Sequence, residues 1–414
     1  MEVMSGRMHM VVSGVHEEWN AKPLEGFISI SHGFAFESEH FASNGSYRLM
    51  TPGNFHEEGG FRDVGDKQKF YLGKIPNDYI LAPGDLVVAM TEQADGLLGS
   101  AALVPEPGYL HNQRIGRVTA LSSDIDLGYL YYVFNSARYR SKVRETAAGT
   151  KVKHTSPGKL LEIVIPIPSP PEQRAIATAL SDMDALLCAL ESLIAKKRDL
   201  KQAAMQQLLT GNTRLPGFNG EWAVKRLGEI CDISIGRTPP RLNSAMWGDG
   251  HVWLSIADLK SKVVSESKEQ ITAFAAESMT VVPKGTLLMS FKLSIGRLCF
   301  AGCDLFTNEA ICSFNNLQED ADFLYYALGR TDFSLYGKQA VKGYTLNKES
   351  LNLVEVRLPS AEEQIAIATV IADIDAELTA LEARRDKTRA LKQAMMQELL
   401  TGKTRLVSRE VAHA

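Results

Sequence analysis

Residues 168–215 read PSPPEQRAIATALSDMDALLCALESLIAKKRDLKQAAMQQLLTGNTRL, and residues 359–406 read PSAEEQIAIATVIADIDAELTALEARRDKTRALKQAMMQELLTGKTRL. The two stretches are 48 residues long, align without a gap and are identical at 30 positions. A long stretch that recurs within one chain indicates an internal repeat. The chain therefore consists of two similar halves, each of which ends in this stretch.

Each copy carries signals for the start and the end of one long helix. Ser169 and Ser360 are each followed three residues later by a glutamate, which is the capping box of a helix N-terminus. Gly211 and Gly402 follow the last apolar residues, where helices commonly end in the left-handed backbone conformation. About 40 residues without an internal glycine or proline lie between these signals, which predicts a rod of roughly 60 Å.

Apolar residues recur in steps of four and three along each predicted helix, as in the seam of a coiled coil. The predicted seam positions are Ile176, Leu180, Met183, Leu187, Leu190 and Ile194 in the first copy and Ile367, Ile371, Ile374, Leu378 and Leu381 in the second. Beyond Ile194 the seam meets Lys197 and Lys201 and restarts from Leu200, which predicts a shift of register. An antiparallel pair within the chain would relate the two halves by a pseudo-twofold axis, and pairing with another molecule is the alternative.

The repeat extends into the segments that precede the helices. The motif Trp-x-x-Lys-x-Leu begins at Trp19 and again at Trp222, a shift of 203 residues, whereas the helices are shifted by 191. The second globular segment is therefore 12 residues shorter than the first. Within these segments the pattern predicts strands at 85–90, 115–120, 286–290 and 297–301 and short helices at 126–139 and 320–328.

The resulting fold prediction is α+β, with two globular mixed α/β domains separated by two long helices that form an antiparallel coiled coil. The predicted boundaries are an N-terminal extension at 1–18, a first domain at 19–168, its long helix at 169–211, a linker at 212–221, a second domain at 222–359, its long helix at 360–402 and a C-terminal tail at 403–414.

The composition is that of an ordinary globular protein. With 414 residues, 45% of them hydrophobic, the chain is long enough for two or three domains. Its five cysteines include no Cys-x-x-Cys pair, so we expect buried thiols in a reducing cytoplasm. No long apolar run occurs in the first 18 residues or later, so we expect neither secretion nor membrane spanning. The net charge is −4, so any contact with nucleic acid requires a local basic surface.

A search for catalytic motifs finds none of the common ones. The sequence contains no phosphate-binding loop, no dinucleotide-binding glycine motif, no His-Glu-x-x-His zinc motif and no Gly-x-Ser-x-Gly nucleophile motif. It also lacks the Asn/Asp-Pro-Pro-Tyr/Phe motif of amino-methyltransferases. We interpret His154 and His251 as surface or core histidines. We therefore expect no catalytic residue, no metal site and no cofactor bound by this chain.

The strongest local signal is a run of positive charge in the first half. Seven cations accompany the single acid Glu145 in this run, namely Arg138, Arg140, Lys142, Arg144, Lys151, Lys153 and Lys159. Such a run suits contacts with DNA phosphates, which supply affinity without reading sequence, and a solvated helix face is the alternative. A thinner version in the second half consists of Arg330, Lys338, Lys342 and Lys348, with Tyr344 among them.

A strand and a proline-containing cap precede each long helix. Residues 163–176 read IVIPIPSPPEQRAI, and residues 354–367 read VEVRLPSAEEQIAI, with Arg357 in place of Pro166 and Glu362 in place of Pro171. Both stretches resemble the conserved regions of type I restriction-modification specificity subunits. The openings at Trp19 and Trp222 resemble the starts of that family's target recognition domains, so the resemblance covers nearly the whole chain.

The resemblance implies a function and a set of partners. In that family the subunit is not catalytic, each target recognition domain reads one half of a bipartite DNA sequence, and the two helices act as a spacer. The implied partners are double-stranded DNA, two methylation subunits and motor-nuclease subunits, in the cytoplasm and without a membrane. The methylation subunits hold S-adenosylmethionine and modify adenine N6, and the motor-nuclease subunits use ATP and Mg.

The residues that we expect to contact DNA are basic or amide side chains and one tyrosine. They are Asn112, Gln113, Arg144, Lys151 and Lys153 in the first domain and Arg241, Arg297, Asn308, Lys342 and Tyr344 in the second. Arginine and amide side chains pair with guanine and adenine edges, although the same polar groups can instead cap turns. We expect methylation subunits to dock on apolar surface near the helix ends, at Leu208, Leu209, Leu399 and Leu400.

Two other classes of function are compatible with the sequence. One is an interaction scaffold, in which two ligand-binding domains are spaced by a coiled coil and bind no DNA. The other is a nuclease or recombinase whose active site matches no common motif.

Overall fold

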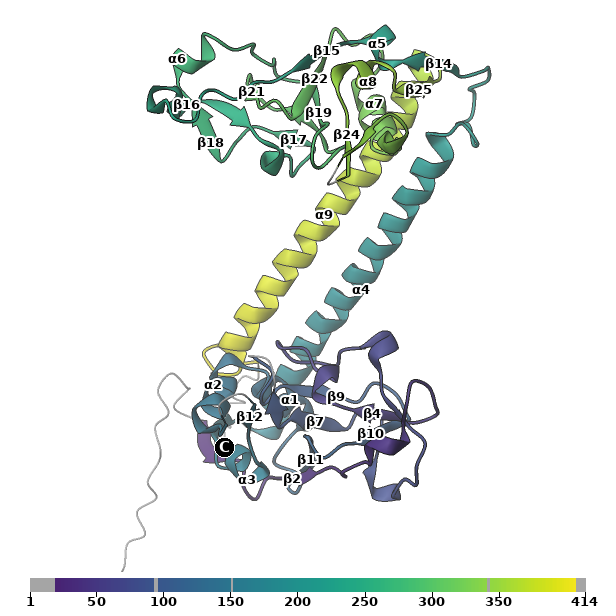
Figure 1. The fold of residues 1–414 in the computed structure, drawn as a ribbon. Coiled ribbons are helices and arrows are strands. Elements are labelled where there is room, and N and C mark those ends of the chain that lie inside the picture. Colours follow the sequence, from purple (N-terminus) through teal and green to yellow (C-terminus); the bar gives the residue numbers. More distant parts are fainter. Residues whose placement is uncertain (1–18, 93–95, 150–151, 341–342, 407–414) are drawn as a thin grey trace, which may run out of the picture. The chain divides into compact units, whose positions relative to one another are not determined.

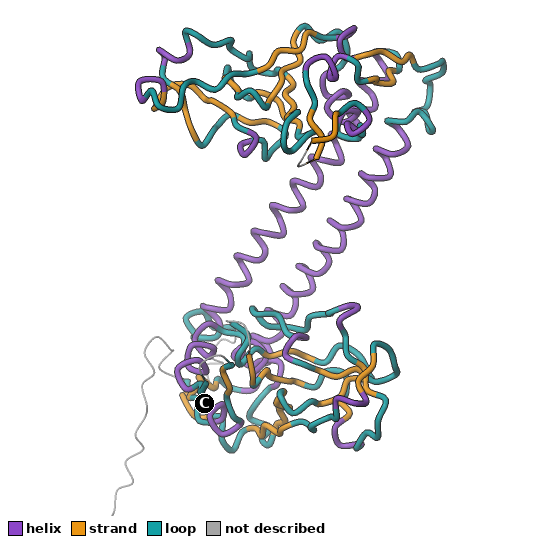
Figure 2. The backbone as a smooth tube through the Cα atoms, viewed as in Figure 1, coloured by secondary structure: helices purple, strands orange, loops and turns teal. Residues whose placement is uncertain are grey.

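The chain divides into two compact units. The computed structural model describes residues 19–92, 96–149, 152–340 and 343–406 (Figure 1). Unit 1 comprises residues 1–191 and 383–414, and unit 2 comprises residues 192–382. Each unit combines helices with several sheets (Figure 2), which confirms the predicted α+β class. Within the described ranges, no helix has the length and apolar character needed to cross a membrane.

Unit 1 is built around a four-stranded and a five-stranded sheet. The four-stranded sheet is antiparallel, in the order β2 (Ile28–His32), β11 (Ile115–Ala120), β7 (Leu86–Ala89) and β9 (Ala101–Leu103). The five-stranded sheet has the order β3 (Phe41–Ala42), β5 (Phe70–Tyr71), β4 (Arg48–Met50), β10 (Tyr109–His111) and β6 (Ile80–Leu81). Two further pairs are β1 (Asn20–Pro23) with β13 (Val164–Ile167) and β8 (Thr91–Glu92) with β12 (Lys153–His154). Its short helices are α1 (Leu127–Phe134), α2 (Ala137–Thr146) and α3 (Pro157–Leu161).

Unit 2 also has two main sheets, but they differ from those of unit 1 in the number of strands. Its five-stranded sheet has the order β15 (Asp232–Ile235), β22 (Ile311–Asn315), β19 (Leu287–Ser290), β20 (Leu298–Ala301) and β17 (Val263–Val264). Its three-stranded sheet has the order β18 (Glu269–Ile271), β16 (Trp247–Leu254) and β21 (Phe306–Thr307). The remaining pairs are β14 (Ala223–Arg226) with β25 (Glu355–Leu358) and β23 (Lys338–Ala340) with β24 (Gly343–Thr345). Its short helices are α5 (Leu227–Ile230), α6 (Ala273–Ala276), α7 (Ala321–Leu328) and α8 (Lys348–Asn352).

The pairing of strands is the same at equivalent positions of the two repeats. Asn20 pairs with Ile167 in unit 1, and Ala223 pairs with Leu358 in unit 2. These two pairs occupy equivalent positions of the repeated sequence. The strand that leads into each long helix is therefore held by the opening strand of the same half.

The predicted short elements agree with the structure except at one break. β7, β11, β19 and β20 lie within the predicted strands, and α7 lies within the predicted helix at 320–328. The single helix predicted at 126–139 is wrong, because α1 ends before Asn135 and α2 begins after Ser136. The side chain of Asn135 bonds both backbone groups of Ala101, at 3.0 and 3.1 Å, and Ser136 caps α2 by accepting from Tyr139 N. A tertiary contact and a cap thus interrupt the helical pattern.

The two long helices of the chain are α4 (Pro170–Leu208) and α9 (Ala361–Leu399) (Figure 1). Gly211 and Gly402 adopt φ values of 72° and 74°, so both helices are followed by the left-handed residue that the sequence predicts. At the other end of α9, Ser360 Oγ accepts a hydrogen bond from Glu363 N at 3.4 Å. The helix bounds therefore follow from local capping signals.

The main core of each unit includes residues from both long helices. In unit 1, Ile176 and Leu180 of α4 pack with Leu399 and Leu400 from the end of α9. In unit 2, the corresponding core contains Leu208 and Leu209 together with Ile367 and Ile371. Burial of one such side chain contributes about 1.5–3 kcal/mol. Each globular part is thus completed by the start of one helix and the end of the other. The four leucines predicted to dock partners lie in these cores, 3–9% exposed, so they offer little free surface.

Ion pairs show the direction of the two helix segments within each unit. In unit 1, Lys392 Nζ lies 2.5 Å from Asp184 Oδ1, and Arg389 pairs with Glu191 at 3.0 Å. Along these pairs the residue number rises on α4 while it falls on α9, so the segments are antiparallel.

The same arrangement recurs in unit 2. Lys201 pairs with Asp375 at 2.6 Å, and Lys197 pairs with Glu377. The side chain of Leu200 is 49% exposed, so the predicted restart of the apolar seam at that residue is wrong. The lysines that interrupt the seam form ion pairs instead.

Each aspartate of these pairs also binds a tyrosine from the globular part of its unit. Tyr132 donates to Asp184 at 2.9 Å in unit 1, and Tyr326 donates to Asp375 at 2.9 Å in unit 2. Burial and the neighbouring carboxylate raise the pKa of both phenols, so the hydroxyls keep their protons and remain donors. These hydrogen bonds tie α1 and α7 to the long helices.

A buried glutamate at the start of each long helix is paired with an arginine from beyond the end of the other. Arg405 donates from Nε and Nη2 to the two oxygens of Glu172 in unit 1, and Arg214 donates likewise to Glu363 in unit 2, at 2.6 and 2.5 Å. Both glutamate side chains are 1% exposed. Bidentate pairs of this kind are strong and directional. The capping signal in the sequence indicates the glutamates but not these partners.

The cysteines fit the expectation only in part. Cys231, Cys299 and Cys312 are buried free thiols, and burial raises the pKa of Cys231 and of Cys299 to about 12. Cys188 is exposed on α4 and Cys303 is partly exposed, so the expectation of buried thiols is wrong for them.

Replacement of Arg405 by alanine should destabilise unit 1. The change leaves the buried carboxylate of Glu172 without its arginine, and loss of one partner of a buried pair costs about 3–5 kcal/mol. We expect a lower unfolding free energy in denaturant titrations of the full chain, and partial recovery on the additional change Glu172→Gln. Lys403→Ala is the matched control, because its pair with Glu398 is about half exposed and should contribute less than about 1 kcal/mol. Equal effects of the two alanine variants would contradict the assignment.

Candidate nucleic-acid interface

In each unit a glycine directly follows β2 or β15, the edge strand of a main sheet. Two backbone segments cross closely at this glycine. A Cβ added to Gly33 would lie 2.3 Å from backbone atoms of His111 and Asn112. A Cβ added to Gly236 would lie 2.1 Å from Thr307 Oγ1 and 2.2 Å from its carbonyl oxygen. Only glycine fits such an approach. Both crossings hold a predicted DNA-contact segment against the end of β2 or β15.

In unit 1 the crossing presents Asn112 and Gln113. Phe34 N donates to His111 O at 2.8 Å, and Gln113 N donates to Phe34 O at 3.0 Å. His111 is buried, and its Nε2 lies 2.9 Å from Ile115 O. Burial lowers the pKa of this imidazole, so it is neutral at physiological pH. Gln113 is exposed and Asn112 is partly exposed, so both side chains are placed to meet a ligand.

In unit 2 the equivalent crossing presents Asn308 and Glu309. Arg237 N donates to Thr307 O at 2.8 Å. Asn308 Oδ1 accepts from Ala310 N at 3.1 Å, so this amide caps a turn, as the alternative interpretation allows. A hydrogen bond from Thr238 lowers the pKa of Glu309, and the charges of Lys292 and Arg241 lower it further.

Arg241 is held by an aromatic pair and one carboxylate. Its guanidinium carbon lies 4.0 Å from the ring centre of Trp247 and 5.0 Å from that of Trp253. Its Nη1 lies 2.7 Å from Glu269 Oε1, and the side chain remains 50% exposed. Cation–π contacts at exposed sites contribute about 0.5–1 kcal/mol each and restrict the guanidinium to one plane. An arginine restrained in this way suits bidentate contact with a phosphate or a guanine edge.

Arg297 is exposed at the start of β20. Its backbone N donates to Ser290 Oγ at 3.1 Å, so it closes the loop of residues 291–297. Lys292 lies on the same loop and was missed by the sequence analysis, because an isolated lysine outside a charge run gives no signal. The tryptophans beneath Arg241 were missed for a similar reason, since Trp253 is 12 residues away in sequence.

Part of the basic run in unit 1 is structural. Arg140 is buried and donates to three backbone carbonyls, those of Leu98 at 2.9 Å, Glu57 at 3.2 Å and Gly96. Its interpretation as a phosphate contact is therefore wrong, because its guanidinium is used inside the unit. Burial lowers the pKa of Arg140 to about 10, so the group stays charged at physiological pH. Arg144, one turn further along α2, is exposed.

Lys153 lies beside a buried carboxylate. Its Nζ is 3.8 Å from Glu92 Oε1, and Glu92 Oε2 accepts from the backbone N–H groups of Leu97 and Leu98 at 2.7 and 2.5 Å. This carboxylate fixes the turn before Ser100 and neutralises part of the basic run. Lys151 and Lys342 lie outside the described residues. Of Tyr344, only the backbone in β24 is described.

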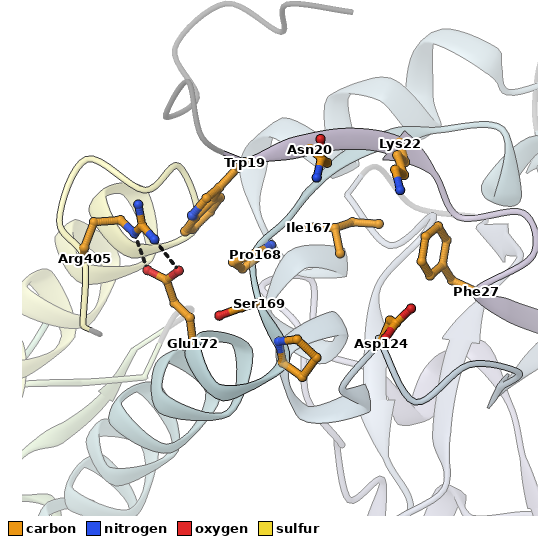
Figure 3. A pocket seen from close by; sticks show the side chains of 11 residues that line it. Trp19, Asn20, Lys22, Phe27, Asp124, Ile167, Pro168, Ser169, Glu172 and Arg405 are labelled. Atoms are coloured by element: carbon orange, nitrogen blue, oxygen red, sulfur yellow. Dashed lines mark hydrogen bonds and ion pairs between the residues drawn. The ribbon is translucent and has the colours of Figure 1, made fainter. Parts of the chain in front are cut away.

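A separate pocket of about 380 Å³ lies where α4 begins (Figure 3). Its walls include Trp19, Lys22, Phe27 and Ser169, and the Arg405–Glu172 pair lines one side. It shares no residue with the predicted DNA contacts. Among the described residues, the acidic and histidine side chains close enough together to hold a metal ion are the exposed Glu37, Glu39 and His40. Exposed acidic groups of this kind are common without an ion, so they do not define a site.

Comparison with known proteins identifies the family to which the chain belongs. A family profile described as "Type I restriction modification DNA specificity domain" matches residues 16–201 and again residues 219–389. The chain belongs to this family.

Two relatives illustrate the likeness in sequence. The type I restriction enzyme MjaVIII specificity subunit of Methanocaldococcus jannaschii is 28% identical over 211 residues, which cover 50% of this chain and 49% of the relative. The type I restriction enzyme EcoBI specificity subunit of Escherichia coli is 27% identical over 207 residues, which cover 48% of this chain and 40% of the relative. The chain thus matches about half or less of the length of these relatives.

A solved structure supports the family fold. The crystal structure of the type I restriction-modification system S subunit from M. genitalium superimposes with a TM-score of 0.59 at 16% identity. The superposition covers 94% of this chain and 97% of the other. This likeness extends over both specificity domains and both long helices.

The two arginines of α2 should respond differently to neutral substitution. Arg140→Met should lower the unfolding free energy by about 1–3 kcal/mol, because the buried guanidinium no longer donates to these backbone carbonyls. Arg144→Met should change it by less than about 0.5 kcal/mol, because the side chain is exposed. Denaturant titration of the full chain measures both values. Similar effects would mean that Arg140 does not hold the carbonyls of residues 57, 96 and 98.

Proposed function

We propose that this protein is the sequence-specific DNA-recognition subunit of a type I restriction-modification complex and is not itself catalytic. The observation that carries the proposal is the presence of two specificity domains, each with its own backbone crossing and exposed basic side chains. One domain would read one half of a bipartite target, and the other domain would read the other half. Double-stranded DNA is the ligand, and the cytoplasm is the expected location.

The domains and the spacer follow the sequence boundaries. The target recognition domains correspond to residues 19–168 and 222–359, and the helices at 169–211 and 360–402 act as the spacer between the half-sites. A helical spacer suits half-sites about one turn of DNA apart, roughly 34–36 Å. The seam residues of both helices would keep this spacing.

The proposed DNA contacts fall into two groups by chemistry. Arg144, Lys151 and Lys153 in the first domain and Arg241 and Lys342 in the second would contact phosphates, which set affinity and its dependence on salt. Contacts with bases or with the DNA backbone would come from Asn112, Gln113, Arg297 and Asn308, and Tyr344 is a further candidate. In support, Gln113, Arg144, Arg241 and Arg297 are exposed and belong to elements fixed by hydrogen bonds.

The proposed partners supply the chemistry. Two methylation subunits would dock on the two halves of the repeat, bind S-adenosylmethionine and methylate adenine N6 in each half-site. Motor-nuclease subunits would use ATP and Mg to translocate and cleave unmodified DNA. The duplicated helices support a two-to-one arrangement, because each half offers a similar sequence to a partner.

A scaffold that binds no DNA is the second candidate function. It is favoured by the ion pairs that engage Arg241 and Lys153 and by the net charge of −4. The two candidates differ in their effect on the methylation of host DNA.

Deletion of the gene should abolish one bipartite adenine-methylated motif in the host genome. Single-molecule sequencing of DNA from the wild-type, the deletion strain and a complemented strain measures this loss. The complemented strain, which should regain the motif, is the control. An unchanged set of methylated motifs would exclude the proposed function and favour the scaffold.

Neutral substitution of Lys151 and Lys153 should weaken DNA binding by the assembled complex. Each phosphate contact contributes about 0.9 to the slope of log affinity against log salt, so the double change to glutamine should reduce the slope by up to about 1.8. Filter binding or fluorescence anisotropy over a range of salt concentrations gives the slope. Lys196→Gln, an exposed change on α4, is the matched control. An unchanged slope would remove these lysines from the interface.

A further inference from the structure

The loop between β19 and β20 presents an apolar side chain to solvent from a strained backbone. Leu293 is 88% exposed and has a φ of 63°. Leucine rarely adopts this left-handed conformation, because its Cβ approaches the following carbonyl oxygen. The side chain gains no compensating burial within the described structure. Strained residues persist where the surrounding structure holds them, and they cluster at functional sites.

The base of the loop holds this conformation. Ser290 is fully buried, and its hydroxyl donates to Ser294 O while it accepts from Arg297 N at 3.1 Å. Gly296 N donates to Ser290 O at 2.8 Å. A Cβ on Gly296 would meet the ring of Phe333 at 3.3 Å, so the loop lies closely against the unit. Leu293 is therefore held at the tip by contacts that do not involve its own side chain.

The surroundings of the loop indicate the chemistry of a partner. Lys292 precedes Leu293, with its Nζ 5.4 Å from the ring of Phe291, and the exposed Arg297 closes the loop. The loop itself therefore carries two cations, one on each side of Leu293 in the sequence. An apolar tip flanked by cations fits a polyanion with an apolar interior, which describes the grooves of DNA.

We propose that Leu293 is a specificity-determining residue that contacts base pairs in the half-site read by unit 2. Its methyl groups would meet either a thymine methyl group in the major groove or the faces of a base step in the minor groove. Lys292 and Arg297 would contact the flanking phosphates. The inference rests on the proposed function and assigns a reading residue within it.

Two substitutions separate recognition from folding. Leu293→Asn keeps a similar size and tolerates the left-handed conformation, and Leu293→Gly removes both the side chain and the strain. Both variants should be at least as stable to heat as the wild-type. Each should nevertheless bind the specific duplex about 10-fold more weakly, which is the effect of one lost base contact. Leu353→Ala, which truncates a leucine that is 51% exposed ahead of β25, is the control and should change neither property.

The experiment uses the complex purified from its host and a duplex that carries the methylated motif of the wild-type. Two kinds of measurement form the readout. One is the affinity of each complex for this duplex and for random DNA, and the other is the motif that is methylated in each variant strain. We expect the Leu293 variants to lose preference at one position of one half-site, with random-DNA affinity unchanged. Deoxyuridine in place of thymine tests the methyl contact, and 2-aminopurine fluorescence tests unstacking. A response of the wild-type to either probe that the Leu293 variants lack supports the proposal.

Unchanged affinity and an unchanged motif in the Leu293 variants would overturn this inference and leave the proposed function intact. Equal loss of specific and random DNA binding, with a lower melting temperature, would also overturn it by indicating a structural role. Absence of any motif in the wild-type strain would instead overturn the proposed function itself.

Discussion

Each globular part of this protein buries the start of one long helix together with the end of the other, and the rest of the structure depends on this packing. In unit 1 the shared core contains Ile176 and Leu399, and in unit 2 it contains Ile367 and Leu208. Neither globular part has a complete core without a helix segment from the other half of the sequence. A single half of the chain would therefore leave apolar surface exposed at both ends of its helix.

Polar contacts at equivalent positions give this packing its direction. The pair formed by Glu172 and Arg405 and the pair formed by Glu363 and Arg214 close the helix ends. Buried pairs of this kind add direction and specificity, because an unpaired carboxylate in the core is costly. The hydrogen bonds of Tyr132 and Tyr326 to helix aspartates also hold the short helices α1 and α7 against the long helices. The duplication thus preserves a set of contacts as well as a pattern of apolar residues.

The surfaces at the two backbone crossings diverge, although the scaffold is repeated. Both units use a glycine to bring two backbones together, yet the residue after that glycine is Phe34 in one and Arg237 in the other. Unit 2 restrains Arg241 on two tryptophans, which have no counterpart in the sequence of unit 1. Two domains that recognise different half-sites would need the same backbone crossing with different side chains. The two matches to the DNA specificity domain family agree with this interpretation.

By itself the sequence determined the duplication, the ends of the long helices, the α+β class and several of the strands, because these depend on local signals. Capping residues, terminal glycines and apolar periodicity act within a few residues of one another. The tertiary structure alone decided which charges are available. Arg140 lies inside the basic run yet bonds three backbone carbonyls, whereas Lys292 stands alone in sequence and its charge lowers the pKa of Glu309. The availability of a cation depends on groups that are distant along the chain, so no local pattern can reveal it.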